Sequence, residues 1–356
     1  MIRMRRIQFL ASAVMACLIF GAVGVFPKTF AQTTPALTIG VSIQPLAGVV
    51  REVGGIYTSI SVLLPEGIEP HTFTLTPAVI AEANSADFLV LTGHFTWEEE
   101  LANQTGKPYI TLEDYEAMGA ELLPLVGYSE ISSRITHQHD HNDNLHGYWL
   151  LPQNAIAIAN ATRIMCSSLN ATFIQYWQGR FNEFVLEVTE LEAFIAEQSQ
   201  LNGFSGKRVV ITFPAEAYVT EALGLDVVAL LSEGENIFIS GPELFAVEQA
   251  LRNRSVNLIL ASDVARLQAA GEFAQQLSAD SGVPLVWLRI IFSALEDYIG
   301  IMAYNTGVVA TGVGGGIPSV SDFLIISMPV IIIAAILGGI AVIELVLLIR
   351  YTRVRD

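Results

Sequence analysis

Short apolar runs and amphipathic stretches alternate in two separate blocks of the chain. In the first block, we predict strands at 36–42, 57–64, 87–91 and 108–111, with helices at 46–53, 77–83 and 97–102. In the second, we predict strands at 208–212, 227–231, 258–261 and 284–288, with helices at 216–223, 243–253, 265–281 and 295–306. This alternation is typical of βαβ units, so each block should form a mostly parallel sheet flanked by helices.

The two blocks are joined by a stretch with helical periodicity. A helix is predicted at 153–169, and a longer one at 171–201, where Gly179 is the only glycine or proline. A helix of that length in a compact domain commonly bridges lobes. The predicted fold is therefore α/β, with an N-terminal lobe at 33–170, an interlobe helix at 171–201 and a C-terminal lobe at 202–311.

Both ends of the chain carry long apolar runs. Residues 1–32, with a basic start followed by an apolar core, resemble an export signal, although the core is also long enough for an uncleaved anchor. A Gly-rich tether at 312–322 leads into an apolar span at 323–349 with Glu344 as its single charge. Arginines in the tail at 350–356 place that tail in the cytoplasm, so the lobes would lie on the outer face of the cytoplasmic membrane.

Charge and cysteine content narrow the possible functions. The formal net charge is −17, with 33 acidic and 11 basic residues between 33 and 322, a field that repels nucleic acid and attracts cations. Only Cys17 and Cys166 are present, so a thiolate metal site is not expected. Four sequons, Asn103, Asn160, Asn170 and Asn253, permit glycosylation without establishing it.

The six histidines are concentrated in the first half of the chain. Two stand alone, His71 and His94, and four lie within ten residues: His137, His139, His141 and His146. Asp140 and Asp143 are interleaved with them, which adds oxygen donors to imidazoles suited to zinc. A solvated polar loop is the alternative interpretation of this cluster.

Four segments resemble motifs of the zinc/manganese solute-binding proteins of ABC importers. Segment 64–77 (LPEGIEPHTFTLTP) resembles their first metal-ligand motif, and segment 146–155 (HGYWLLPQNA) their second. Segment 213–218 (FPAEAY) and the helical segment 298–305 (YIGIMAYN) are similar to their later motifs. The resemblance covers roughly 37–308. It implies that His71 and His146 are metal ligands and that the loop at 137–143 collects metal as an accessory element.

The chain departs from this family where the C-terminal lobe should supply ligands. Phe213 stands where the family has His or Glu, and Arg289 lies where manganese-type members carry Asp. Three replacements remain open: Glu216, His94 or a histidine of the loop. For Glu216, a solvated helix-start residue that compensates the helix dipole is the more common situation, and for His94 a histidine at the edge of the core is an explanation at least as good as a ligand.

The resemblance implies an extracytoplasmic receptor, not an enzyme, that binds Zn²⁺ and delivers it to a cognate ABC permease. We expect a monomer. Mn²⁺ is the alternative cargo, and a tethered adhesin or sensor that no longer transports metal is the alternative role. A zinc metallohydrolase is a third possibility, because Glu69 or Glu216 would suit a general base. Ligands of ordinary imidazole pKa would release metal as the pH falls through about 6.5.

Overall fold

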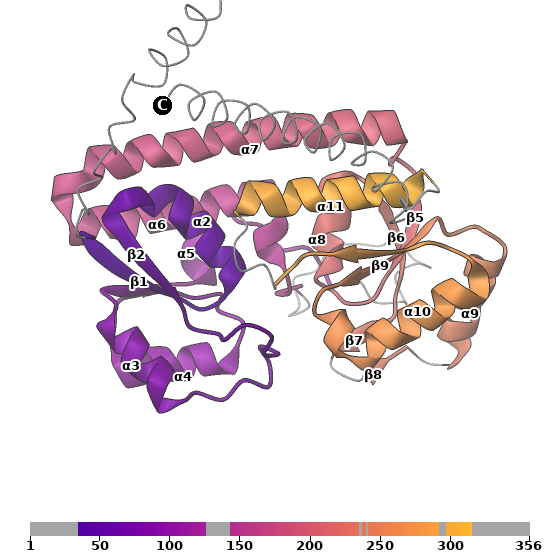
Figure 1. The fold of residues 1–356 in the computed structure, drawn as a ribbon, viewed down its shortest axis with the longest axis horizontal. Coiled ribbons are helices and arrows are strands. Elements are labelled where there is room, and N and C mark those ends of the chain that lie inside the picture. The colour runs from indigo at the N-terminus through magenta and orange to yellow at the C-terminus, as the bar shows by residue number, and fades with distance from the viewer. Residues whose placement is uncertain (1–34, 126–142, 235–236, 240, 292–296, 315–356) are drawn as a thin grey trace, which may run out of the picture.

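The computed structural model describes residues 35–125, 143–234, 237–239, 241–291 and 297–314. Within them the chain forms two α/β lobes side by side, with one long helix lying across both (Figure 1). The predicted export signal, the apolar span at 323–349, and His137, His139, Asp140 and His141 fall outside the described residues. In the part of the chain that is described, none of the helices combines the length and apolar character needed to cross a bilayer.

The N-terminal lobe is built on a four-stranded parallel sheet of order β2-β1-β3-β4. Its strands are β1 (Leu37–Val41), β2 (Thr58–Val62), β3 (Phe88–Val90) and β4 (Tyr109–Ile110). The helices of this lobe are α2 (Gln44–Gly54), α3 (Pro77–Ser85), α4 (Thr96–Thr105), α5 (Leu112–Ala117) and α6 (Pro152–Leu169). The strand order reverses at β1, and in such sheets ligands bind beyond the carboxyl ends of the strands.

The C-terminal lobe repeats this plan with a parallel sheet of order β10-β9-β5-β6. Its strands are β5 (Arg208–Ile211), β6 (Asp226–Leu230), β9 (Leu258–Ser262) and β10 (Leu285–Leu288), with a hairpin of β7 (Ser232–Gly234) and β8 (Ile237–Phe238). The helices are α8 (Glu216–Leu223), α9 (Gly241–Arg252), α10 (Ala269–Ser281) and α11 (Tyr298–Val313). The predicted two-lobe α/β fold is confirmed.

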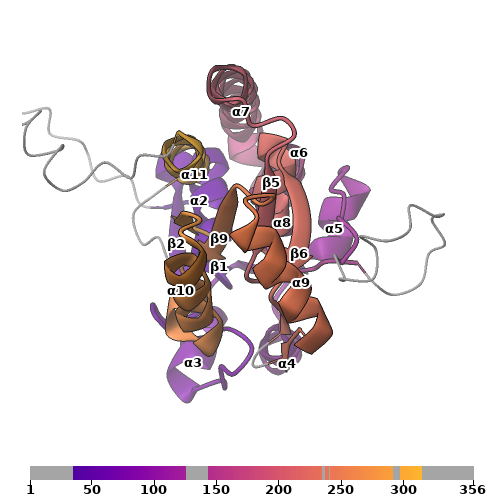
Figure 2. The same cartoon turned by 90° about the vertical axis from the view of Figure 1, so that its right-hand side faces the viewer.

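The interlobe helix is α7 (Ile174–Asn202), preceded by a 3-10 turn at Ala171–Phe173. Its buried side chains form one stripe: Trp177, Phe184, Val188, Leu191 and Ile195. Helix α7 packs on α2 and α6 of the first lobe and on α8 and α11 of the second (Figures 1 and 2). The helix ends at Gly203, whose φ of 62° is left-handed. A single helix therefore joins the two cores.

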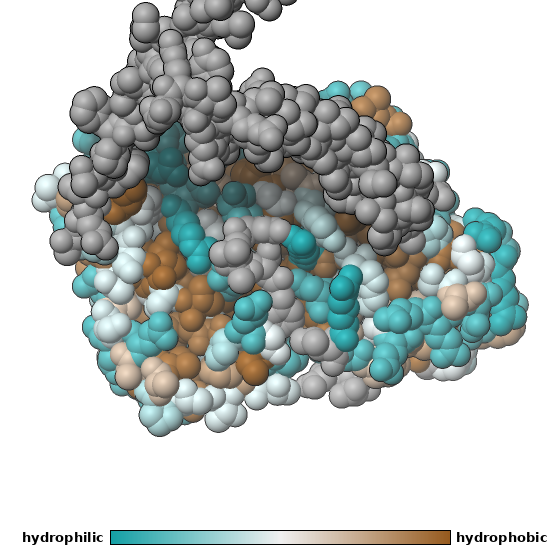
Figure 3. All heavy atoms as spheres, in the orientation of Figure 1, coloured by the Kyte–Doolittle hydropathy of each residue, from teal (hydrophilic) through white to brown (hydrophobic). Residues whose placement is uncertain are grey.

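Two hydrogen bonds donated by side chains also connect the lobes. The Tyr298 hydroxyl of α11 donates to the Leu150 carbonyl at 3.0 Å, and Trp149 Nε1 donates to the Ile290 carbonyl at 3.3 Å. The hydrophobic core is continuous across these contacts. Hydrophobic side chains also reach the surface on the N-terminal half of the face shown in Figure 3.

Several boundaries differ from those predicted. The helix expected at 265–281 is divided at Gln268, whose extended backbone separates a 3-10 turn (Ala265–Leu267) from α10. Helix α11 continues past its predicted end at residue 306 and includes the first two residues assigned to the tether. Within this extension, Gly312 allows close packing on β10, because a Cβ there would lie 2.5 Å from Val286 Cγ2. Helix α5 and the β7–β8 hairpin were not predicted.

Candidate metal centre

His71 lies on the loop between β2 and α3, at the carboxyl end of the first sheet. The loop is held by Trp97 of α4, whose Nε1 donates to the Pro70 carbonyl at 3.1 Å. Glu69 Oε2 accepts from the Thr72 backbone N–H at 2.8 Å, which closes the turn around the histidine. The backbone of His71 is therefore positioned by contacts on both sides of it.

His94 lies in the turn between β3 and α4, which is organised by the buried carboxylate of Glu98. This carboxylate accepts from the Thr92 N–H at 2.8 Å and the Thr92 hydroxyl at 2.6 Å. It also accepts from the backbone N–H groups of His94 and Phe95, each at 3.2 Å. A charged acceptor with several donors stabilises a turn more strongly than neutral hydrogen bonds do, so the position of His94 is well defined.

His146 lies just before α6, in a segment bound to the second lobe. Its N–H donates to Asn144 Oδ1 at 3.0 Å, while Asn144 Nδ2 donates to the Pro214 carbonyl at 2.8 Å. The Tyr218 hydroxyl of α8 donates to the Asn144 carbonyl. The next residue, Gly147, has a φ of 82°, and a Cβ there would lie 3.0 Å from the Ala215 carbonyl oxygen. The tight interlobe contact thus requires glycine beside the histidine.

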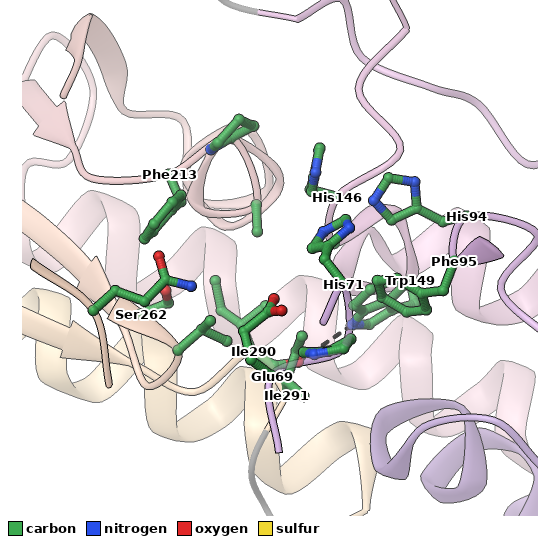
Figure 4. Close-up of a pocket in the computed structure, with 16 residues that line it drawn as sticks. Glu69, His71, His94, Phe95, His146, Trp149, Phe213, Ser262, Ile290 and Ile291 are labelled. Atoms are coloured by element: carbon green, nitrogen blue, oxygen red, sulfur yellow. Dashed lines mark hydrogen bonds between the residues drawn. The ribbon is translucent and has the colours of Figure 1, made fainter. Parts of the chain in front are cut away.

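These three loops bring His71, His94 and His146 together (Figure 4). The ring centroids are 4.4 Å apart for His94 and His146, 4.8 Å for His71 and His94, and 5.4 Å for His71 and His146. One nitrogen from each ring lies within 4.8 Å of the others. Zinc with Zn–N bonds of about 2.0–2.1 Å needs nitrogens about 3.3 Å apart, a spacing that small side-chain rotations would provide.

Two nitrogens of this cluster are buried without a hydrogen-bond partner among the described residues: His94 Nε2 and His146 Nδ1. Burial, followed by the neighbouring histidines, lowers the pKa of His94 to about 3. Burial and then His71 lower the pKa of His146 to about 4. Both rings are therefore neutral at physiological pH. Neutral imidazoles with unpartnered nitrogens are the state in which histidine binds a metal ion.

The opposite wall of the pocket comes from the second lobe and is mainly apolar. Phe213 faces the histidines across the cavity, with Ile290 and Ile291 below it (Figure 4). Ser262 and Gln268 are the polar side chains that the described part of this lobe places on the lining. The cavity holds about 600 Å³ when the space open to solvent is included. Glu69, from the first lobe, also lines it.

Two of the three candidates for the third ligand, His94 and Glu216, lie among the described residues, and they occupy different environments. His94 lies in the cluster, whereas Glu216 is not among the residues that line the pocket. Glu216 is fully buried instead of solvated, and burial raises its pKa to about 7 despite several hydrogen bonds. Its carboxylate accepts from the Thr212 hydroxyl at 2.7 Å, from the Ser262 N–H at 2.6 Å and from the Phe213 N–H. Glu216 thus supports the loop that carries Phe213.

Of the predicted accessory loop at 137–143, Asp143 alone lies among the described residues. Asp143 is exposed and forms an antiparallel bridge with Pro124, outside the histidine cluster. Glu98 and Asn144, which hold two of the histidines, were not singled out from the sequence. The signal for Glu98 was present, since a Glu three residues after Phe95 at the start of a helix is suited to accept backbone N–H groups there.

Comparison with solved structures finds the same two-lobe fold. The SBP FpvC of P. aeruginosa in complex with Ni²⁺ is 21% identical, with a TM-score of 0.62 over 78% of this chain and 97% of that chain. A ZnuA crystal structure is 19% identical, with a TM-score of 0.64 over 78% and 99% of the two chains. Streptococcus pneumoniae AdcAII is 20% identical, with a TM-score of 0.63 over 79% and 100%.

A comparison with the curated proteins finds no match. The sequence pattern of one family, ZnuA, described as zinc-uptake complex component A, periplasmic, matches residues 39–312. That range includes both lobes, the interlobe helix and all three clustered histidines. It is a family of extracytoplasmic metal-binding receptors and not of enzymes. The chain belongs to the ZnuA family of zinc/manganese ABC-transporter solute-binding proteins.

Proposed function

We propose that this protein is a receptor for a divalent transition-metal ion, with zinc as its cargo, and that His71, His94 and His146 bind it. The observation that carries the proposal is the convergence of three imidazoles, with two buried nitrogens that lack hydrogen-bond partners among the described residues. Buried polar atoms without partners are costly unless a ligand satisfies them. A bound cation would remove that cost.

The ligand set favours zinc over manganese. All three clustered donors are imidazole nitrogens, which suit zinc, copper and nickel, whereas manganese prefers carboxylate, carbonyl and water oxygens. Glu69 lines the pocket but is not part of the cluster. We therefore expect zinc to bind more tightly than manganese at equal concentration.

Delivery to an ABC permease is proposed from family membership, since the family is a zinc-uptake component. We further propose that the segment at 323–349 anchors the receptor in the membrane and that 137–143 collects metal as an accessory loop. The tethered adhesin or sensor is the second candidate role, and Phe213 favours it because it supplies no donor opposite the histidines.

Elemental analysis of the purified protein after exposure to zinc and dialysis tests the proposal. We expect one tightly bound zinc per chain, lost when His71, His94 and His146 are together replaced by Ala. Gln104→Ala, an exposed change on α4, is the matched control and should retain the zinc. Metal-free wild-type protein would refute the receptor function and leave the adhesin or sensor role.

A further inference from the structure

The proposed site leaves one side of the metal ion without a protein ligand. The three imidazoles all come from loops of the first lobe and its connection to α6. Zinc in proteins is usually four-coordinate. Across the cavity stands the aromatic ring of Phe213, which cannot coordinate a metal (Figure 4). On the proposed function, therefore, a fourth coordination position faces the pocket.

The wall facing that position suits an organic group. Phe213, Val264, Ile290 and Ile291 present apolar surface to the cavity. Gln268 also lines it, and its Oε1 is buried without a hydrogen-bond partner in the described part of the chain. Rotation of the terminal torsion exchanges the amide oxygen for the NH₂ group, so this side chain can donate or accept. An apolar wall with one polar group that fixes orientation is typical of a small-molecule site.

The positive charge of a bound divalent ion also needs compensation inside the pocket. Imidazole ligands carry no charge, so the charge of a divalent ion must be offset by other groups in this partly enclosed, apolar pocket, where unpaired charge is costly. The Glu69 carboxylate, whose Oε2 accepts from the Thr72 N–H, lines the same pocket and can offset one of the two positive charges. One charge is then left without a counter-charge among the described lining residues. An anionic ligand from solution would supply both the fourth donor and a compensating charge.

We propose that the substrate of this receptor is a divalent metal ion together with a small organic carboxylate. The carboxylate oxygen takes the fourth coordination position, and the amide of Gln268 hydrogen-bonds to the second oxygen. The apolar body of the carboxylate packs against Phe213 and Ile290. This inference rests on the proposed function and goes beyond it, because it assigns a second component to the cargo.

Cobalt substitution gives a direct test, because the visible absorption of Co²⁺ reports its ligands. The purified full chain is loaded with Co²⁺ and titrated with acetate, propionate and butyrate. We expect a saturable spectral change whose apparent Kd falls about fourfold for each added methylene, as expected for burial of a CH₂ group against an apolar wall. Gln268→Leu should weaken this step several-fold while leaving Co²⁺ affinity unchanged.

Phe213→His and Glu69→Gln complete the experiment. Phe213→His offers an imidazole to the fourth position, so it should retain Co²⁺ and abolish the response to carboxylates. Glu69→Gln tests whether the Glu69 carboxylate occupies the fourth position, and the exposed change Gln104→Ala on α4 is the control that should leave both steps intact. No response in the wild type, no dependence on chain length, or a response that appears only in Glu69→Gln would overturn the inference while the receptor function stands. Failure to bind Co²⁺ at all would instead overturn the proposed function and this inference with it.

Discussion

The pH dependence of zinc binding separates this site from one built of ordinary histidines. Protons compete with metal for each imidazole, so acid weakens binding only near or below the pKa of the ligand. Burial and the neighbouring rings lower the pKa of His94 to about 3 and that of His146 to about 4. These two ligands should therefore remain neutral and available well below the usual imidazole range. The simple expectation of release near pH 6.5 needs correction for them.

The size of the loss in zinc affinity follows from how much each imidazole is protonated at a given pH. Between pH 7.5 and 5.5, one ligand with a pKa near 6.5 would cost about tenfold in zinc affinity, and three would cost about a thousandfold. His94 and His146, with pKa values of about 3 and about 4, bind almost no protons over that interval. The loss should therefore fall well short of a thousandfold, because neither of these two ligands contributes to it.

Equilibrium dialysis against buffered zinc, with the bound metal measured by elemental analysis, gives the affinity at each pH. The protein used should lack 137–143, so that weaker loop sites do not contribute. A loss approaching a thousandfold between pH 7.5 and 5.5 would refute the reasoning, because it would require that His94 and His146 titrate like exposed histidines.

Three further predictions concern the surroundings of the cluster. Deleting 137–143 should leave one tight zinc site within about threefold of the wild-type affinity and remove only weak binding; loss of the tight site in dialysis would place a loop histidine among the ligands. Glu98→Ala should lower the free energy of unfolding by about 3 kcal/mol and weaken zinc binding, because four hydrogen-bond donors lose the carboxylate that accepts from them. An unchanged midpoint in denaturant unfolding would contradict this prediction. Gly147→Ala should lower the free energy of unfolding by at least about 1 kcal/mol, because the φ of Gly147 is 82° and the Ala215 carbonyl is close. Gly179→Ala, in open space on α7, should raise it by about 0.5–1 kcal/mol. Equal effects of the two changes in thermal unfolding would refute this contrast.

Much of the fold could be predicted because its signals are local. The interlobe helix was expected at 171–201, and α7 is Ile174–Asn202, since its apolar stripe and lack of interruption are properties of contiguous residues. The end of α11 was not predicted, because Gly312 stops a helix by propensity but is tolerated where it packs against Val286. Where a helix ends at such a glycine depends on tertiary packing, which cannot be read from the local sequence.

The site was predictable only in part for the same reason. His71 and His146 lie in recognisable motifs, so both could be predicted as metal ligands from the sequence alone. His94 joins them because β3 neighbours β1 in the sheet and the turns after β2 and β3 reach the same edge. Glu216 had the right chemistry for a ligand, but its carboxylate faces the backbone of its own lobe. Whether a side chain turns inward or towards the pocket depends on contacts with residues distant in sequence.

We propose that three imidazoles hold the zinc ion and that His94 is the third of them. X-ray absorption at the zinc edge of the loaded protein tests it most directly, since the outer-shell scattering of imidazole counts the histidine ligands. We predict three imidazole nitrogens at about 2.0–2.1 Å in the wild type and two in His94→Ala. Two imidazoles in the wild type, or identical spectra for wild type and His94→Ala, would contradict it.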